Sequence, residues 1–460
     1  MPLVAGVDSS TQSTKVLVCD ADSGAIVATG RAPHPPTTPP RSEQDPRAWM
    51  AALDAALAET GHRDEFREIS IGAQQHGLVV VGPDDQALRP AKLWNDTESA
   101  PDAAWLLGRL PGGAAAWADA VGSVPVAAFT IAKLSWLHRT EPEVFHRIAR
   151  VMLPHDWIAW QLTGEVATDR GDASGTGYWS PSSESYRTDL LELVDDTVDW
   201  VAALPTVASA DAALGTGDNM AAALGAGLRP GDVLVSLGTS GTVCAVSDRP
   251  TSDPSGAVAG FADATGRFLP LVCTLNAAKV TDAFARLLGV DHTAFDELAL
   301  RAQPGSGGVV LLPYLDGERT PDRPEATGAL RGIRSDVSRE QLARAAVEGV
   351  VCGLLDGLDA LRAASVDVDS GRLVLVGGAA RSAAYRSVLA DLAQRAVTAP
   401  DATELVALGA TVQSAARMHA TPAGEIASAW GLGSGTTFDP AIGAETAARI
   451  RSAYASVRDT

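Results

Sequence analysis

Short apolar runs separated by polar turns open the chain. Residues 3–8 form an apolar run that ends in an aspartate, and a hydroxyl-rich turn occupies residues 9–14. Residues 15–20 form a second run, whose apolar centre lies between a lysine and an aspartate. Residues 22–24, Asp-Ser-Gly, are typical of a hairpin turn, and residues 25–28 continue as a third run. The pattern predicts a meander of three strands with a polar corner between the first two.

A related pattern opens the second half of the chain. Residues 232–236 predict a strand, the motif GTSG forms a corner at residues 238–241, and residues 242–248 predict the returning strand. Two such units, one in each half, indicate duplicated α/β domains. The repeat is degenerate, so coincidence is the alternative.

Helical periodicity fills the intervals between these strands. Asp45 followed by Pro46 predicts a helix start, and Trp49, Leu53 and Leu57 then fall on one face. Three further segments have a helical pattern, namely residues 278–289, 338–363 and 384–396.

Length and glycine content suggest how the chain is divided. A chain of 460 residues exceeds the size at which one hydrophobic core stops growing, so two domains are expected, with three as the alternative. We place the boundary in the glycine-rich stretch 225–231, where a hinge is also expected, which gives domains 1–228 and 229–460.

Composition narrows the class of protein. Hydrophobic residues make up 46% of the chain and charged residues 20%, as in ordinary globular proteins. The net charge of −20 argues against nucleic-acid partners, although ATP, which is held by local groups, stays compatible. No apolar run approaches the roughly 20 residues of a membrane span, and no basic segment precedes an apolar one at the start. Four scattered cysteines without C-x-x-C spacing are typical of thiols in a reducing compartment, so a cytoplasmic protein is expected.

The first corner could bind a phosphate. Asp8 ends a strand, where a carboxylate can hold Mg²⁺, and the next turn offers backbone amides and hydroxyls such as Thr11 to phosphate oxygens. Lys15 adds a positive charge. The alternative is a polar hairpin in which the aspartate only caps its own turn.

Two further elements could bind a nucleotide. The corner at residues 238–241 could supply amides to the same phosphates, and the apolar strand 373–376 ends in Gly377 and Gly378, which let a base or ribose approach the backbone. A tight turn without a ligand is the alternative for this pair. The chain contains neither a Walker motif nor a G-x-G-x-x-G between strand and helix, which disfavours P-loop and Rossmann folds.

Asp218 is the best candidate for a catalytic group. It stands in a glycine-flanked loop beside the expected domain boundary, where a carboxylate could reach an interdomain cleft and accept a proton from a hydroxyl. The alternative is that it caps a helix over residues 219–224. Residues 74–76 (Gln-Gln-His) and 94–96 (Trp-Asn-Asp) offer donors, acceptors and an aromatic face for a sugar, but could also be structural.

Taken in order, these segments resemble the FGGY carbohydrate kinases, and most closely the xylulokinases within that family. The resemblance covers roughly residues 3–415, and the YLDGERTP run at residues 314–321 is its most specific piece. The other matching motifs are SEQDP (42–46), QQHG (74–77), LWND (93–96), FT (129–130), LPHD (153–156), TD (168–169), GDN (217–219), SLGTSG (236–241), EGV (348–350) and GGAARS (377–382).

The resemblance implies two actin-like (ribonuclease H-like) α/β domains, with ATP and Mg²⁺ between them. The N-terminal domain would bind the sugar and the C-terminal domain the nucleotide. Asp218 would be the catalytic base, and Asp8 would serve the magnesium ion. The sugar site would contain Gln75, His76 and Asn219, with Trp94 and Asp96 nearby. The phosphates would contact Thr11, Gln12, Ser13, Lys15 and Thr239, and the adenosine would lie against Gly378 and Ser382.

Three departures from the family pattern stand out. Gln75 replaces the usual methionine of Gln-Met-His-Gly, His155 replaces the lysine of Leu-Pro-Lys-Asp, and Ala379 replaces a glycine. The first departure touches the expected sugar pocket, where an added amide can select between substrates.

The activity that the resemblance implies is ATP-dependent phosphorylation of a ketopentose, with D-xylulose giving D-xylulose 5-phosphate. Alternatives are a family kinase for ribulose, another ketose, glycerol or gluconate and, more remotely, an actin-like ATPase that is not a kinase. The expected partners are a small sugar and ATP, with no nucleic acid and no membrane, and a homodimer is compatible with the sequence.

Overall fold

The computed structural model describes residues 2–460, which form two compact units. The first unit extends to Leu228 and also contains Asp248–Leu269 and Glu404–Gly433. The second consists of Arg229–Ser247, Pro270–Thr403 and Ser434–Thr460. Each compact unit is assembled from three separate stretches of chain, so a single division after residue 228 does not describe them. The expected boundary between domains 1–228 and 229–460 stays a prediction.

The first unit is built on a five-stranded sheet with the order β13-β5-β1-β2-β3. Its strands are β1 (Leu3–Ser9), β2 (Ser13–Asp20), β3 (Ile26–Pro33), β5 (Phe66–Ala73) and β13 (Gly215–Gly217). The first three pair antiparallel and so confirm the predicted meander, while β5 and β13 are parallel to β1. The polar corner is shorter than predicted, because the β1–β2 pairing already joins Ser9 to Thr14.

The sheet of the second unit repeats this order. Strands β17 (Phe268–Thr274), β15 (Gly241–Ala245), β14 (Val233–Leu237), β20 (Leu373–Val376), β21 (Val397–Pro400) and β22 (Gly435–Phe438) follow one another across it. The meander β14–β15–β17 is antiparallel, and β20 and β21 are parallel to β14. When the edge strands β16 (Ala259–Ala262) and β22 are left aside, both sheets run third, second, first, fourth, fifth in chain order, which confirms the predicted internal repeat.

Helix α1 (Pro46–Thr60) covers one face of the first sheet. Asp45 caps it by accepting a hydrogen bond from Arg47 N at 3.0 Å, as the sequence predicts. Trp49 and Leu53 are buried in one cluster with Ala5 and Val7 of β1. Burial of these side chains is the main force that holds the helix on the sheet.

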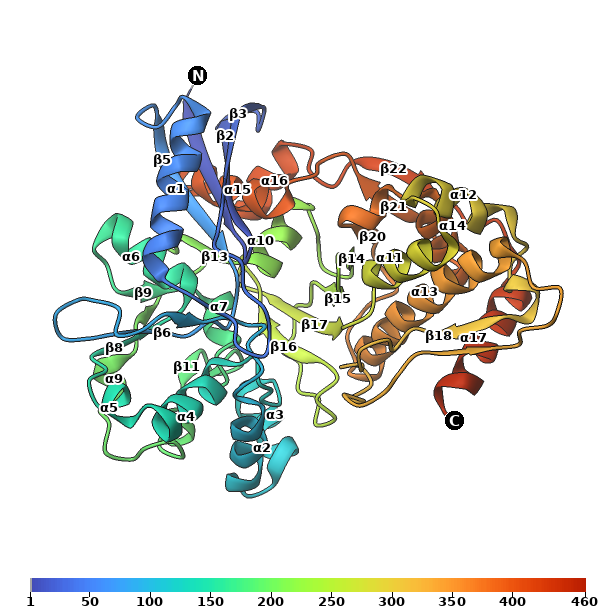
Figure 1. The fold of residues 1–460 in the computed structure, drawn as a ribbon. Helices are drawn as coiled ribbons and strands as arrows, with labels where there is room; N and C mark the ends of the chain where they lie inside the picture. Colours follow the sequence, from blue (N-terminus) through green and yellow to red (C-terminus); the bar gives the residue numbers. More distant parts are fainter. Residues whose placement is uncertain (1) are drawn as a thin grey trace. The chain divides into compact units, whose positions relative to one another are not determined.

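Helix α15 (Leu405–His419) packs against β1, β2 and β5 of the same sheet (Figure 1, red helix beside the blue strands). Ser414 Oγ donates to the carbonyl of Ala5 at 2.6 Å. A Cβ on Gly6 would lie 2.2 Å from the carbonyl oxygen of Ala407, so only glycine allows this approach. β1 is buried along its whole length because it is covered on both sides.

The remaining helices complete the two cores. In the first unit they include α2 (Ala100–Arg109), α3 (Gly113–Val121), α4 (Thr130–Thr140), α6 (Pro154–Thr163), α7 (Arg170–Ser174), α10 (Asp218–Gly225) and α16 (Ala423–Ala429). In the second unit they include α11 (Ala278–Leu288), α12 (His292–Arg301), α13 (Arg339–Ala363), α14 (Ala383–Ala393) and α17 (Ala444–Arg458). The three predicted helices correspond to α11, α13 and α14. Across residues 2–460, every helix is too short or too polar to cross a bilayer.

Candidate functional site

Asp218 lies where strand β13 meets helix α10. It is the first residue of α10 and is half-buried. Its Oδ1 accepts hydrogen bonds from the backbone N of Asn219 at 2.8 Å and from Asn219 Nδ2 at 3.0 Å. The same Nδ2 donates to Gln75 Oε1 at 2.9 Å. The structure thus brings together three of the residues predicted for catalysis and sugar binding.

The surroundings of Asp218 make its carboxyl weakly acidic. Burial, followed by the negative charge of Asp8, raises its pKa from 3.8 to about 7. A carboxyl with such a pKa exchanges its proton near neutral pH, as a general base must. The predicted alternative, in which Asp218 caps the following helix, does not match the structure, because the N-cap residue is Gly217 and Asp218 is already inside α10.

His76 lies at the end of the segment that follows β5, in a left-handed conformation with φ of 66°. Its Nδ1 donates to the carbonyl of Gly175 at 2.8 Å. The ring packs against Phe129 and Phe261, with centroid distances of 5.0 and 5.5 Å. This strained, half-buried position differs from that of an ordinary core histidine.

The corner between β1 and β2 carries the expected charged pair. Asp8 and Lys15 are partners across the two strands, with Oδ2 and Nζ 3.6 Å apart, and Lys15 Nζ also donates to Glu404 Oε2 at 2.7 Å. Asp8 is 6% exposed, and its Oδ1 has no hydrogen-bond partner among residues 2–460. Burial raises its pKa to about 6, partly opposed by Lys15.

Other residues of this corner already have protein partners. Thr11 Oγ1 accepts from Trp94 Nε1 at 2.9 Å and donates to Gln74 Oε1 at 3.1 Å. Gln12 is exposed, whereas Ser13 is buried. Trp94 is 39% exposed, so one part of its ring is open to a ligand.

Asp96 has a different environment from the one expected. Its side chain is fully buried, and its Oδ2 accepts from Ser42 N and Lys92 Nζ, both at 2.9 Å. Oδ1 accepts from Glu98 N at 3.0 Å. The carboxylate is therefore engaged in holding two loops together, and we remove Asp96 from the sugar-binding set.

The second unit contains a cavity of about 310 Å³ at the ends of β14 and β20. Thr239, Gly378 and Ser382, all predicted to contact ATP, line it together with the apolar Leu237 and Phe295. A Cβ on Gly378 would meet no atom within 4 Å, so this glycine borders open space. The hydroxyl of Ser382 caps α14 by accepting from Tyr385 N at 3.1 Å, and it also donates to Asp296.

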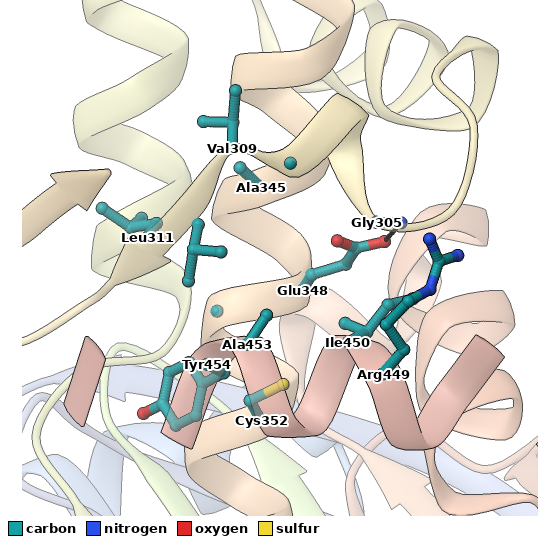
Figure 2. A pocket seen from close by; sticks show the side chains of 13 residues that line it. Gly305, Val309, Leu311, Ala345, Glu348, Cys352, Arg449, Ile450, Ala453 and Tyr454 are labelled. Atoms are coloured by element: carbon teal, nitrogen blue, oxygen red, sulfur yellow. Dashed lines mark hydrogen bonds between the residues drawn. The ribbon is translucent and has the colours of Figure 1, made fainter. Parts of the chain in front are cut away.

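A second cavity, of about 170 Å³, lies between β18 (Val310–Leu312), α13 and α17 (Figure 2). Its lining is mostly apolar. Glu348, part of the EGV motif, accepts from Gly305 N at 2.9 Å, Ser306 Oγ at 3.0 Å and Arg344 Nε at 2.8 Å (the bond to Gly305 is dashed in Figure 2). These bonds tie a loop to α13, so the motif has a structural role.

Four residues of the neighbourhood were not predicted as site residues. Phe261, from β16 (Ala259–Ala262), completes the ring cluster at His76, and Glu404 binds Lys15. Asp172 lies on α7, beside β13, and Asp169 is the N-cap residue of the same helix. Only Asp169 had a sequence signal, through its place in a family motif; the others depend on contacts between distant segments.

Comparison with known families decides the class. The model of the FGGY family of carbohydrate kinases, N-terminal domain, matches residues 3–246, and that of the C-terminal domain matches residues 233–418. The chain belongs to the FGGY family of carbohydrate kinases. As an FGGY kinase it transfers a phosphoryl group from ATP to a sugar, and its two-domain, actin-like fold is confirmed. The alternative of an actin-like ATPase that is not a kinase is wrong.

Individual relatives cover nearly the whole FGGY chain. It is 46% identical to the xylulose kinase of Streptomyces coelicolor and to that of Streptomyces rubiginosus, in each case over 95% of this chain and 92% of the relative. Among solved structures, xylulose kinase from Bifidobacterium adolescentis superposes with a TM-score of 0.88 at 38% identity, over 99% of both chains.

Proposed function

We propose that this kinase phosphorylates D-xylulose, giving D-xylulose 5-phosphate and ADP. The observation that supports this substrate is the 46% identity to two proteins named xylulose kinase, across almost the full length. Because ATP is supplied in the cytoplasm and the cysteines are thiols, we propose a cytoplasmic enzyme.

Asp218 is the base in this proposal. The 5-hydroxyl oxygen of the sugar forms a bond to the γ-phosphorus while the bond from that phosphorus to the β,γ-bridging oxygen breaks. The hydroxyl proton passes to Asp218. Both hydrogen bonds from Asn219 go to Oδ1, which orients the carboxylate and leaves Oδ2 for the proton. Such a base contributes about 10²–10⁴-fold to the rate.

The corner at Asp8 fits a magnesium ion. A buried carboxylate oxygen without a hydrogen-bond partner and with a pKa raised to about 6 is stabilised by a nearby cation. Mg²⁺ prefers oxygen ligands and, when bound with ATP, neutralises charge on the phosphates. We assign Asp8 to this ion and Lys15, Thr11, Gln12 and Ser13 to the surroundings of the phosphates.

Gln75, His76, Asn219 and Trp94 form the proposed sugar site. Its side-chain amides match a polyhydroxylated chain, and the indole offers a face to C–H groups. Because the family usually has methionine at position 75, the amide of Gln75 favours a second candidate, a kinase for a related ketose such as ribulose.

The cavity at Thr239, Gly378 and Ser382 is the proposed site for adenosine. Its volume of about 310 Å³ and its mostly apolar wall suit a planar base. The open space beside Gly378 would let the ribose or base approach the backbone.

A substrate panel tests the proposal. The purified protein is assayed with ATP, Mg²⁺ and each of D-xylulose, D-ribulose, L-ribulose, glycerol and gluconate, with ADP release and sugar phosphate both measured. We expect the highest kcat/KM for D-xylulose and a phosphate on O5. A higher kcat/KM for another acceptor would transfer the assignment to that sugar.

A further inference from the structure

Four ionisable side chains lie buried together beneath the proposed sugar site. They are His155, Asp156, Asp169 and Asp172, with exposed fractions of 2%, 1%, 3% and 0%. His155 Nδ1 is 3.3 Å from Asp156 Oδ1, 3.7 Å from Asp169 Oδ2 and 3.9 Å from Asp172 Oδ2. One imidazole nitrogen thus faces three carboxylates.

His155 provides the cation of this group. Asp156 is on its own helix, α6, Asp172 is on α7, and Asp169 is the N-cap residue of α7. β9 (Ala167–Thr168) and β13, which also pack on α6, contain no ionisable side chain. The charged residues on the other elements that contact α6 pair elsewhere or are exposed: Glu68 of β5 pairs with Arg417, Asp54 of α1 with Arg63, Arg47 of α1 with Asp45, and Arg150 of β8 (Arg150–Met152) with Asp85, Glu59 of α1 accepts from Arg31 N, and Arg67 of β5 is exposed. Arg170 of α7 pairs with Glu184.

Burial of an ion without compensation is costly, so the group must retain protons. Burial opposes the charge on His155, but Asp156 and Asp169 outweigh it and place its pKa above the usual range. Burial and the neighbouring carboxylates raise the pKa of Asp169, and raise that of Asp172 well above its usual range. An imidazolium surrounded by carboxylates, some of which keep their protons, leaves little uncompensated charge in this buried group.

Helix α7 connects this group to the proposed catalytic residues. Asp169 Oδ1 accepts from Thr216 Oγ1 at 2.7 Å, and Thr216 belongs to β13, two residues before Asp218. A Cβ on Gly217 would lie 2.6 Å from Gln75 Cγ and 2.8 Å from Asp172 Oδ1. At the other end of α7, the carbonyl of Gly175 receives the hydrogen bond from His76.

We propose that His155 is a positioning residue for phosphoryl transfer. Its positive charge holds the carboxylates of α7 against β13, and thereby fixes the carboxylate of Asp218 and the side chains of Gln75 and His76. The inference rests on the proposed role of Asp218 as base. Because position 155 is usually lysine in the family, whose charge persists to high pH, the histidine adds an alkaline limit to activity.

The sign of the pH dependence follows from these shifts. A histidine with a raised folded-state pKa contributes stability that is complete below about pH 6.5 and is lost as pH rises through the folded value. The pKa values of Asp169 and Asp172 are also raised, so their contributions to folding stability are likewise lost as pH rises. Comparison with His155→Lys isolates the part of this pH dependence that is due to the imidazole.

The test uses His155→Gln and His155→Lys, with His62→Gln as control because His62 pairs with Glu65 at the surface, away from this group. We measure kcat, the KM values for the sugar and for ATP, and the thermal midpoint without substrates, from pH 6 to pH 9.5. His155→Gln should lower kcat at least tenfold at pH 7 with a smaller change in ATP KM. Its loss of thermal midpoint should shrink as pH rises. His155→Lys should restore most of kcat and move the alkaline limb at least one pH unit higher.

Three outcomes would overturn the proposal. The first is wild-type kcat and thermal midpoint in His155→Gln at every pH. The second is an alkaline limb in His155→Lys that coincides with that of the wild type. The third is one equivalent of bound metal in the wild type that disappears in His155→Gln. Asp218→Ala, assayed alongside, separates the role of Asp218 as base from the role of His155 as positioning residue. Full turnover in Asp218→Ala would remove the proposed base. Reduced turnover in Asp218→Ala, together with wild-type turnover in His155→Gln, would remove only the positioning role.

Discussion

Asn219 Nδ2 donates to Gln75 Oε1 at 2.9 Å, across 144 positions of sequence. The bond joins the segment after β5 to the start of α10. Asn219 Nδ2 also donates to Asp218 Oδ1. The Gln75 amide, which stands where the family usually has methionine, is therefore linked through Asn219 to the proposed base.

Replacing Asp218 with alanine should lower kcat by about two to four orders of magnitude, because the hydroxyl proton loses its acceptor. KM for ATP should change little, since the adenosine site is built from other residues. Steady-state kinetics with D-xylulose measure both. Asp211→Asn, at an exposed position on the same segment, is the control. Wild-type turnover in Asp218→Ala would remove this residue from the mechanism.

Gln75→Met should change sugar preference more than ATP affinity. A thioether is at most a weak acceptor for Asn219 Nδ2, and it offers no donor to a sugar hydroxyl. Relative kcat/KM values for D-xylulose and D-ribulose should shift by about tenfold, equivalent to about 1.4 kcal/mol. The exposed Gln86→Met serves as control. An unchanged ratio would show that the amide has no part in selecting the sugar.

The pH profile of kcat/KM should have an acidic limb set by Asp218. The base must be ionised, and its pKa in the free enzyme is raised to about 7, so kcat/KM should fall about tenfold per pH unit below that value. Folding stability changes in the opposite direction, because the folded state binds the Asp218 proton more tightly than the unfolded state does. The contribution of Asp218 to stability is therefore complete below about pH 3.8 and is lost as pH rises through about 7. Rates and thermal midpoints measured from pH 5 to pH 9 test both. A limb that stays below pH 5 would contradict the assignment.

Gly409→Ala should destabilise the first unit. A Cβ at this position would lie 1.9 Å from the carbonyl oxygen of Ala221, where α15 crosses α10. Overpacking of this kind costs about 1–3 kcal/mol of the free energy of unfolding, which denaturant titration measures. Gly424→Ala, on α16 with no atom within 4 Å, should be neutral or slightly stabilising. Equal stability of the two variants would show that the helices can move apart at little cost.

Local patterns predicted much of this molecule. The meander, the cap at Asp45 and each of the two strand–corner–strand units all depend on residues close in sequence, where strand and helix periods apply directly. The ordered motifs then indicated the family, which the family models confirm.

Contacts between distant segments could not be predicted in this way. Glu404 reaches Lys15 from 389 positions away, and Asp172 lies under Gly217 because α7 packs on β13. Asp96 looked available next to Trp94, yet Lys92 and two backbone amides occupy its oxygens. Periodicity shows which face of an element is buried, but it does not show which remote side chain meets it.

The place of α15 in the chain has a consequence for biosynthesis. The helix that packs on Gly6 and bonds to Ala5 is translated about 400 residues after β1. At about 5–20 residues per second, the nascent first unit therefore waits some tens of seconds with one face of its sheet uncovered. A chain that stops before residue 404 should stay protease-sensitive and prone to aggregate, and adding residues 404–433 as a separate peptide should protect it.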